Sequence, residues 1–348
     1  MRRLAILFTG CALLLPGAAR SAACSPLNCG SSQVVLSHGT LLAYRAASHA
    51  PVSVADLRSG ESLFSLPWGF VYGKVLVHQE GNRIEWYDAT TGKRTAVARL
   101  PWKIRLAGAS QDGSRAVAFR AKTLVELVTP TSVREVQLPK GNWDFDALRG
   151  NHLVLIQLRS GGYQVRLVDL ARRSARTTKL LKDPHESGTI WGQAWSRLSS
   201  PDGRYVFTLY LASNGAAMVH ELDLATAKAR CIDLPGTGDY GSGTSWGMVL
   251  APDGRTLWLA SPGYGRVVGI DIRTRRILDA FRISLSYWNL GNPTRTAVSP
   301  DGTQLALTDG ETVARIDVHL RRVVGRTPAA HAVAVGYSPD TGDLRTLR

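Results

Sequence analysis

The sequence has little of what marks several large protein classes. Its 348 residues include 4 cysteines and 3 methionines, and only 7% are aromatic. After residue 20 no apolar run approaches the roughly 18–20 residues that a membrane-spanning helix needs, which excludes a multi-pass membrane protein. A hydrophobic content of 44% excludes a disordered chain. The 34 glycines and 16 prolines are scattered at regular places, a pattern typical of many short strands joined by turns.

The motifs of common metal, nucleotide and hydrolase sites are also missing. There is no Cys-x-x-Cys pair and no His-x-x-x-His spacing, so nothing supports a zinc site. There is no Gly-x-Ser-x-Gly elbow, P-loop or dinucleotide fingerprint. The glycine-rich stretch 236–247 leads into no strand-to-helix context and so resembles a long loop, not a phosphate cradle. We therefore expect no metal and no cofactor.

The first 23 residues have the features of an export signal. Arg2 and Arg3 precede an apolar run over residues 4–15, and Ser21-Ala22-Ala23 offers small residues for signal-peptidase cleavage. Cleavage there leaves residues 24–348 as a secreted, periplasmic or cell-surface protein. It also makes Cys24 the first residue, which raises a lipoprotein alternative. Ser21, where a lipobox has an aliphatic residue, favours simple export.

Export changes how the cysteines are interpreted. Cys24 and Cys29 flank a short loop, and a disulfide between them is reasonable in an oxidising compartment. Cys231 lies in an apolar strand-like stretch and is interpreted as a small buried hydrophobe.

The charge is strongly basic. The formal net charge is +15, and +12 remains once Arg2, Arg3 and Arg20 leave with the signal. This excess favours anionic partners, and in an exported protein an acidic glycan, an envelope polymer or a protein partner is a better candidate than nucleic acid. The arginines are spread along the sequence without blocks, so a merely solvated basic surface is the alternative. We expect a monomer.

An internal repeat is the most informative feature of the sequence. Four segments share one turn, and a fifth, degenerate copy follows at Ser338-Pro339-Asp340: Ser110-Gln111-Asp112-Gly113, Ser200-Pro201-Asp202-Gly203, Ala251-Pro252-Asp253-Gly254 and Ser299-Pro300-Asp301-Gly302. Proline presets φ for the first corner, aspartate tolerates the second, and glycine takes the left-handed position that closes a tight hairpin. An alternating strand follows each of the last three copies, as over residues 205–210.

A second marker is an apolar stretch that ends in aspartate. It recurs at Asp56, Asp88, Asp169, Asp223, Asp271 and Asp317, and Val128 fills the missing slot in the gap of 81 residues between the second and third. Seven units over residues 24–348 average about 46 residues, close to the ~40–45 of a propeller blade. Each unit reads as four antiparallel strands. The sequence therefore predicts an all-β fold, a seven-bladed β-propeller of four-stranded antiparallel blades, with a β-sandwich as the alternative.

The combination of Ser-Pro-Asp-Gly, an alternating strand and Ile/Leu-Asp-x-x-Thr resembles bacterial extracytoplasmic propellers with YVTN-type or WD-repeat-like blades. It also resembles the propeller of the periplasmic Tol-system protein. The resemblance covers the mature chain and is strongest over residues 193–340. The resemblance implies the fold but does not select a function, because propellers of this type serve as binding platforms, as lyases or lactonases, and as electron-transfer modules. For ring closure, we expect the C-terminal strand material at 332–348 to pair with the first unit.

The candidate ligand site is one mouth of the central channel, at the loops that lead into the innermost strands. Tryptophans concentrate in those loops: Trp68, Trp102, Trp143, Trp191, Trp195, Trp246 and Trp288. Trp195 and Trp246 each stand seven residues before their turn aspartate. Rings at a mouth can stack on sugars, peptides or cations. The alternative is that they wedge between blades and cap the core.

Two classes of function remain open. The first is an exported, non-catalytic binding or scaffold propeller that uses the tryptophan-bearing mouth. The second is a propeller lyase or lactone hydrolase, in which His185 and His331, with a carboxylate such as Glu186, perform general acid–base chemistry. The second class requires those groups within hydrogen-bond reach of one another.

Overall fold

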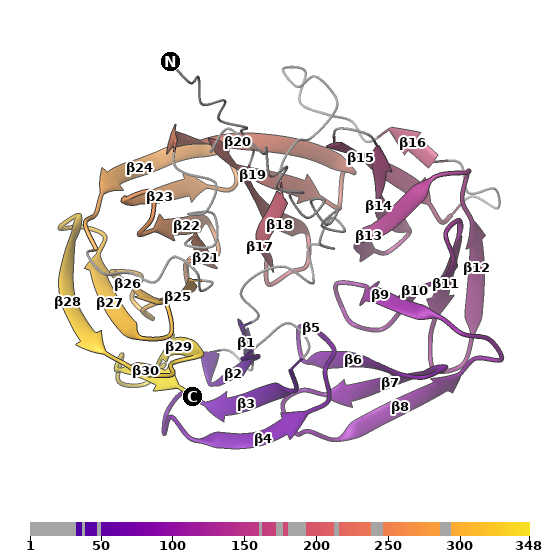
Figure 1. The fold of residues 1–348 in the computed structure, drawn as a ribbon, viewed down its shortest axis with the longest axis horizontal. Coiled ribbons are helices and arrows are strands. Elements are labelled where there is room, and N and C mark those ends of the chain that lie inside the picture. The colour runs from indigo at the N-terminus through magenta and orange to yellow at the C-terminus, as the bar shows by residue number, and fades with distance from the viewer. Residues whose placement is uncertain are drawn as a thin grey trace, which may run out of the picture.

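The protein is a ring of antiparallel sheets. The computed structural model describes residues 33–36, 39–46, 50–159, 162–171, 177–179, 193–211, 216–237, 246–285 and 294–348. These residues form thirty strands, arranged as seven four-stranded sheets and one two-stranded sheet that follow one another in a ring (Figure 1). The all-β, seven-bladed propeller is confirmed. In the described residues no helix is long and apolar enough to cross a membrane.

Blades 1 to 4 follow one another along the chain, each with its strands hydrogen-bonded in sequence order. Blade 1 holds β1 (Gln33–Leu36), β2 (Leu41–Tyr44), β3 (Val52–Asp56) and β4 (Ser62–Leu66). Blade 2 holds β5 (Phe70–Tyr72), β6 (Val75–Glu80), β7 (Arg83–Asp88) and β8 (Arg94–Arg99). Blade 3 holds β9 (Arg105–Ala109), β10 (Ala116–Ala121), β11 (Leu124–Val128) and β12 (Val133–Gln137). Blade 4 holds β13 (Asn142–Arg149), β14 (His152–Arg159), β15 (Gly162–Asp169) and β16 (Thr177–Lys179).

Blades 5 to 7 repeat this order and are followed by a hairpin. Blade 5 holds β17 (Gln193–Ser199), β18 (Tyr205–Leu211), β19 (Ala216–Asp223) and β20 (Lys228–Thr237). Blade 6 holds β21 (Gly247–Leu250), β22 (Thr256–Ser261), β23 (Arg266–Asp271) and β24 (Arg276–Arg282). Blade 7 holds β25 (Arg295–Val298), β26 (Gln304–Thr308), β27 (Thr312–Asp317) and β28 (Arg322–Pro328). The hairpin holds β29 (Ala334–Tyr337) and β30 (Leu344–Leu347).

The repeated turns join the first two strands of blades 3, 5, 6 and 7. In each, the glycine N–H donates to the carbonyl of the first turn residue at 2.7–2.9 Å. The glycine φ lies between 63° and 75°, the left-handed region that favours glycine. The aspartate Oδ1 accepts the N–H two residues further on, at 2.8–3.1 Å. The predicted chemistry of this turn is confirmed.

The aspartates at the third strand fix the next turn. In all six blades that carry it, Oδ1 accepts the N–H two residues later at 2.8–3.0 Å. In blade 5 the carboxylate of Asp223 also pairs with Arg204, the residue that follows the Pro-Asp-Gly turn. In blade 3 the third strand ends at the fully buried Val128, as the repeat predicts. The marker is therefore a structural device of the blade.

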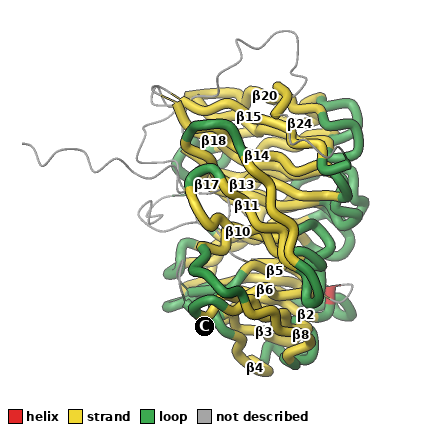
Figure 2. Tube along the Cα trace, turned by 90° about the vertical axis from the view of Figure 1, so that its right-hand side faces the viewer, coloured by secondary structure: helices red, strands yellow, loops and turns green. Residues whose placement is uncertain are grey.

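Apolar residues fill the spaces between neighbouring blades. One cluster joins blades 3 and 4 around Phe145, another joins blades 5 and 6 around Phe207 and Trp246, and a third joins blades 6 and 7 around Trp258. Each sheet thus buries both faces against its neighbours, and only its outermost strand lies at the rim. Figure 2 shows the resulting stack of blades from the side.

The ring closes differently from the sequence-based expectation. The C-terminal strands pair with each other and form no sheet with blade 1, so the expected pairing is wrong. The hairpin lies between blade 7 and blade 1 (Figure 1) and packs against both through side chains. Arg345 donates to the carbonyl of Arg58 at 2.9 Å, and Arg58 pairs with Asp340 at 2.5 Å. Closure therefore depends on a wedge of two strands and not on a shared sheet edge.

Candidate functional site

The alternating strand directions give the ring two unlike faces. The turns between first and second strands and between third and fourth strands lie on one face, which we call the hairpin face. The turns between second and third strands and the links between blades lie on the other, which we call the connection face. The predicted tryptophan-bearing mouth belongs to the connection face.

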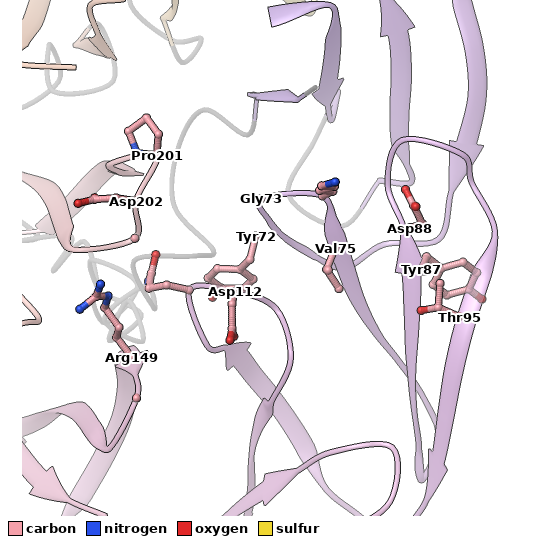
Figure 3. Close-up of a pocket in the computed structure, with 14 residues that line it drawn as sticks. Tyr72, Gly73, Val75, Tyr87, Asp88, Thr95, Asp112, Arg149, Pro201 and Asp202 are labelled. Atoms are coloured by element: carbon pink, nitrogen blue, oxygen red, sulfur yellow. The ribbon is translucent and has the colours of Figure 1, made fainter. Parts of the chain in front are cut away.

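A cavity of about 640 Å³ opens on the hairpin face. Its walls come from the turns of four consecutive blades, 2 to 5, which Figure 3 shows converging. The lining residues are Tyr72, Gly73, Lys74, Val75, Tyr87, Asp88, Thr95, Gln111, Asp112, Arg149, Gly150, Pro201, Asp202 and Gly203. Each of the four blades contributes the turn between its first and second strands, and these turns meet because each follows an innermost strand of the ring.

The acidic residues of the cavity are occupied by their own turns. Burial alone would raise the pKa of Asp112, but hydrogen bonds from Ser110 and Ser114 outweigh it and lower that pKa. The pKa of Asp202 is lowered in the same way, by hydrogen bonds that outweigh its burial. Both carboxylates therefore stay ionised and are held at fixed positions at the mouth.

The basic residues of the cavity form no ion pair within 4.0 Å among the described residues. Lys74 lies in the turn between β5 and β6 and is exposed, and Arg149 ends β13 and is half-buried. Each is near an acidic residue of the cavity: Lys74 helps to lower the pKa of Asp88, and Arg149 that of Asp202. These two cations are the charged groups that a ligand in the cavity can engage directly.

A buried ion pair lies beside Tyr72, one of the lining residues of the cavity. Tyr72 is 7% exposed, and burial raises the pKa of its hydroxyl to about 12 despite the nearby charge of Arg197. Arg197 on β17 donates to Asp146 on β13 at 2.6 Å, and both side chains are buried. The ion pair joins the innermost strands of blades 4 and 5. Removing one partner of such a pair would leave a buried charge without its counter-ion, which is strongly destabilising.

Of the four connection-face tryptophans whose side chains are described, Trp143 and Trp246 are buried, and Trp68 and Trp102 are partly buried against a core cluster. Trp246 is 2% exposed and lies 5.1 Å from the ring of Tyr264, and Trp143 is 7% exposed and donates to Pro139 O at 2.9 Å. Trp102 is half-buried with the guanidinium of Arg120 3.9 Å above its ring. Burial of Trp246 and Trp143 is what the wedge alternative predicts. A ligand-binding role for this set remains a prediction.

Several predicted site residues cannot be placed. The following lie outside the described residues: Cys24, Cys29, His185, Glu186, Trp191 and Trp288. Trp195 lies in β17, but its side chain is not described. His331 is exposed in the turn before β29, with a φ of 66°. The disulfide and the acid–base pair therefore stay predictions.

No metal centre is visible in the described part of the chain, where no three His, Cys, Asp or Glu side chains form a ligand group. The sequence did not point to the hairpin-face cavity. Its turns were recognisable one by one, yet their convergence follows only from the ring. Lys74 and Arg149 carry no motif, and the one available signal was their position beside a hairpin turn.

Known proteins resemble this chain in fold alone. No protein-family model matches it, and no curated protein does. Similar solved structures include Kuenenia stuttgartiensis hydrazine synthase, at 15% identity and a TM-score of 0.45, covering 80% of this chain and 94% of that one. Apo AztD from Citrobacter koseri is 12% identical with a TM-score of 0.44, covering 80% and 92%. A eukaryotic initiation factor is 15% identical with a TM-score of 0.48, covering 91% and 81%.

Proposed function

We propose that this chain is an exported, non-catalytic binding propeller that takes an anionic group of an envelope polymer, glycan or protein partner at its hairpin face. The observation that carries the proposal is the cavity built by blades 2 to 5. It offers two cations that form no ion pair within 4.0 Å in the described residues, Lys74 and Arg149, and one of its lining residues, Tyr72, lies beside a buried ion pair. Rigid turns with fixed charges suit recognition, because little conformational entropy is lost on binding.

The charge of the whole chain supports an anionic partner. A net charge of +12 after removal of the signal attracts anions toward the surface and speeds encounter. The carboxylates of Asp112 and Asp202 at the same mouth disfavour a large polyanion lying flat across it. The cavity is therefore suited to one carboxylate, sulfate or phosphate group with an attached polar chain.

A binding array of glycans and envelope polymers at two salt concentrations tests the proposal. We expect K74A/R149A to lower affinity at least about tenfold, since each charge-assisted hydrogen bond contributes about 1.5–3 kcal/mol. The matched control, K122A/K140A, removes two exposed lysines from the connection face. The proposal is contradicted if the control weakens binding and K74A/R149A does not, an outcome that would favour the tryptophan mouth.

A further inference from the structure

Blades 6 and 7 place many arginines on one part of the rim. The last turn and outermost strand of these blades, residues 271–285 and 317–328, contain seven arginines: Arg273, Arg275, Arg276, Arg282, Arg321, Arg322 and Arg326. The two segments are related by the repeat of 46 residues, so that Arg275 and Arg276 correspond to Arg321 and Arg322. Both Arg275 and Arg321 have positive φ, at 62° and 54°.

Some of these arginines join the blades, and others do not. Arg275 pairs with Glu221 of blade 5 at 2.9 Å, and Arg321 pairs with Asp279 of blade 6 at 3.1 Å. Four others are exposed and pair with no carboxylate within the described ranges: Arg273, Arg276, Arg282 and Arg322. The bridging pairs fix the shape of the rim, and the remaining four charges face solvent.

Exposed apolar side chains lie among the same arginines. Six large hydrophobic residues are exposed in the described chain, and four of them belong to these two segments: Ile277 at 40%, Leu278 at 57%, Leu320 at 57% and Val324 at 38%. Their concentration on two of seven blades distinguishes this part of the rim from ordinary scattered exposure.

The two segments lie side by side. The Arg321–Asp279 ion pair joins the last turn of blade 7 to β24 of blade 6, so the segments that carry Leu320 and Leu278 are neighbours. Arg326 of β28 also donates to Ser284 O, just after β24, at 2.7 Å. Figure 1 shows β24 and β28 as consecutive outer strands. We call this surface the blade 6–7 rim; it consists of Arg273, Arg276, Ile277, Leu278, Arg282, Leu320, Arg322 and Val324.

We propose that the blade 6–7 rim docks the protein on an anionic phospholipid surface. Lipid phosphates can accept bidentate hydrogen bonds from the free guanidinium groups, while Leu278 and Leu320 enter the boundary between headgroups and acyl chains. A glycan offers nothing that buries these leucines. The core of a protein interface is enriched in aromatic side chains as well as arginine, and this surface has no aromatic side chain. The proposal is independent of the hairpin-face cavity, which none of these residues lines.

Co-sedimentation with vesicles tests the docking surface. We expect the full chain to bind vesicles of phosphatidylcholine mixed with phosphatidylglycerol, to ignore phosphatidylcholine alone, and to dissociate as salt is raised. R276E/R322E should lower binding at least about tenfold, because each basic residue near an anionic surface contributes about a factor of five. L278S/L320S should weaken binding while leaving its salt dependence in place.

The matched control is K93E/R99E on blade 2, which makes the same change of charge at two exposed residues, one in the turn before β8 and one at the end of that outer strand. It should bind as the wild type does, and thermal melts should show all variants folded, since every substituted side chain is exposed. Three results would overturn the proposal. They are no binding by the wild type, equal loss in the control, and no effect of L278S/L320S. The last would indicate a purely electrostatic surface for an acidic polymer or protein.

Discussion

Replacement of Trp246 by alanine separates the two roles considered for the tryptophans. The side chain is 2% exposed in the apolar cluster that joins blades 5 and 6, and its ring lies 5.1 Å from Tyr264. Removing a buried tryptophan costs about 3–5 kcal/mol, from lost transfer free energy and the cavity left behind. An unfolding entropy of about 2.1 cal/mol/K per residue gives about 0.6 kcal/mol/K for roughly 300 residues. The melting temperature should therefore fall by roughly 5–8 °C.

Differential scanning calorimetry measures this shift, with two comparison variants. W246F keeps most of the apolar contact and should cost about a third as much; the indole Nε1 has no hydrogen-bond partner in the described structure, so its loss adds little. L63A removes a side chain that is 48% exposed and should change stability by less than about 0.5 kcal/mol. An unchanged melt for W246A would refute the wedge, and loss of ligand binding with that unchanged melt would establish the ring as a binding residue.

Three further predictions concern the ring itself. E126Q should stabilise the protein at neutral pH and less at acid pH. Burial raises the pKa of Glu126 and outweighs the opposing charge of Arg120, 3.7 Å away, so ionisation of Glu126 opposes folding as pH rises. Urea unfolding at neutral and acid pH measures this, and a gain that persists at low pH contradicts it. D271N should destabilise the protein at neutral pH, because the Thr274 N–H and other hydrogen bonds favour the ionised Asp271 and lower its pKa to about 2. The difference in unfolding free energy between D271N and the wild type should disappear as pH falls from about 4 to about 2. A loss of stability that does not depend on pH would show that the charge of Asp271 is irrelevant. G336A should cost about 1–3 kcal/mol, since a Cβ there would lie 2.5 Å from Cδ2 of the buried Leu57, at the contact between the hairpin and blade 1. A wild-type melt would show that Leu57 moves aside at no cost and that this contact is not tightly packed.

The blade could be predicted because its signals are local. The four residues of a Ser-Pro-Asp-Gly turn specify the turn by their own φ preferences and by hydrogen bonds within the turn, as in residues Ser299 to Gly302. The aspartate at the end of a third strand likewise contacts only the next few residues. Repetition of two such local devices at a nearly fixed spacing was enough to give the number of blades and the order of strands.

Ring closure could not be predicted, because it is a contact between residues about 290 apart. The sequence of β29 and β30 was recognised as strand and turn material, but nothing local decides whether β30 joins the sheet of blade 1 or packs on its face. Packing is favoured by Gly336, whose missing side chain leaves room for Leu57. The same limit applies to the blade 6–7 rim. Corresponding arginines of the two blades are 46 positions apart in the sequence, so the sequence alone shows basic residues spread evenly along the chain and not the surface they form together.

The propeller uses arginine in two different ways, which limits the self-repulsion of a strongly basic chain. Arg197 pairs with Asp146 and Arg275 with Glu221 of a neighbouring blade, so these positive charges are neutralised where solvent is largely excluded. Arginines on the outer strands are left to solvent, where screening makes their mutual repulsion small. The excess positive charge is thereby displaced to the rim and the mouths, the two places where the ring can meet a partner. An anionic ligand at the cavity and an anionic surface at the rim would each lower the remaining repulsion, so both proposals predict that binding raises the melting temperature and that added salt reduces the increase.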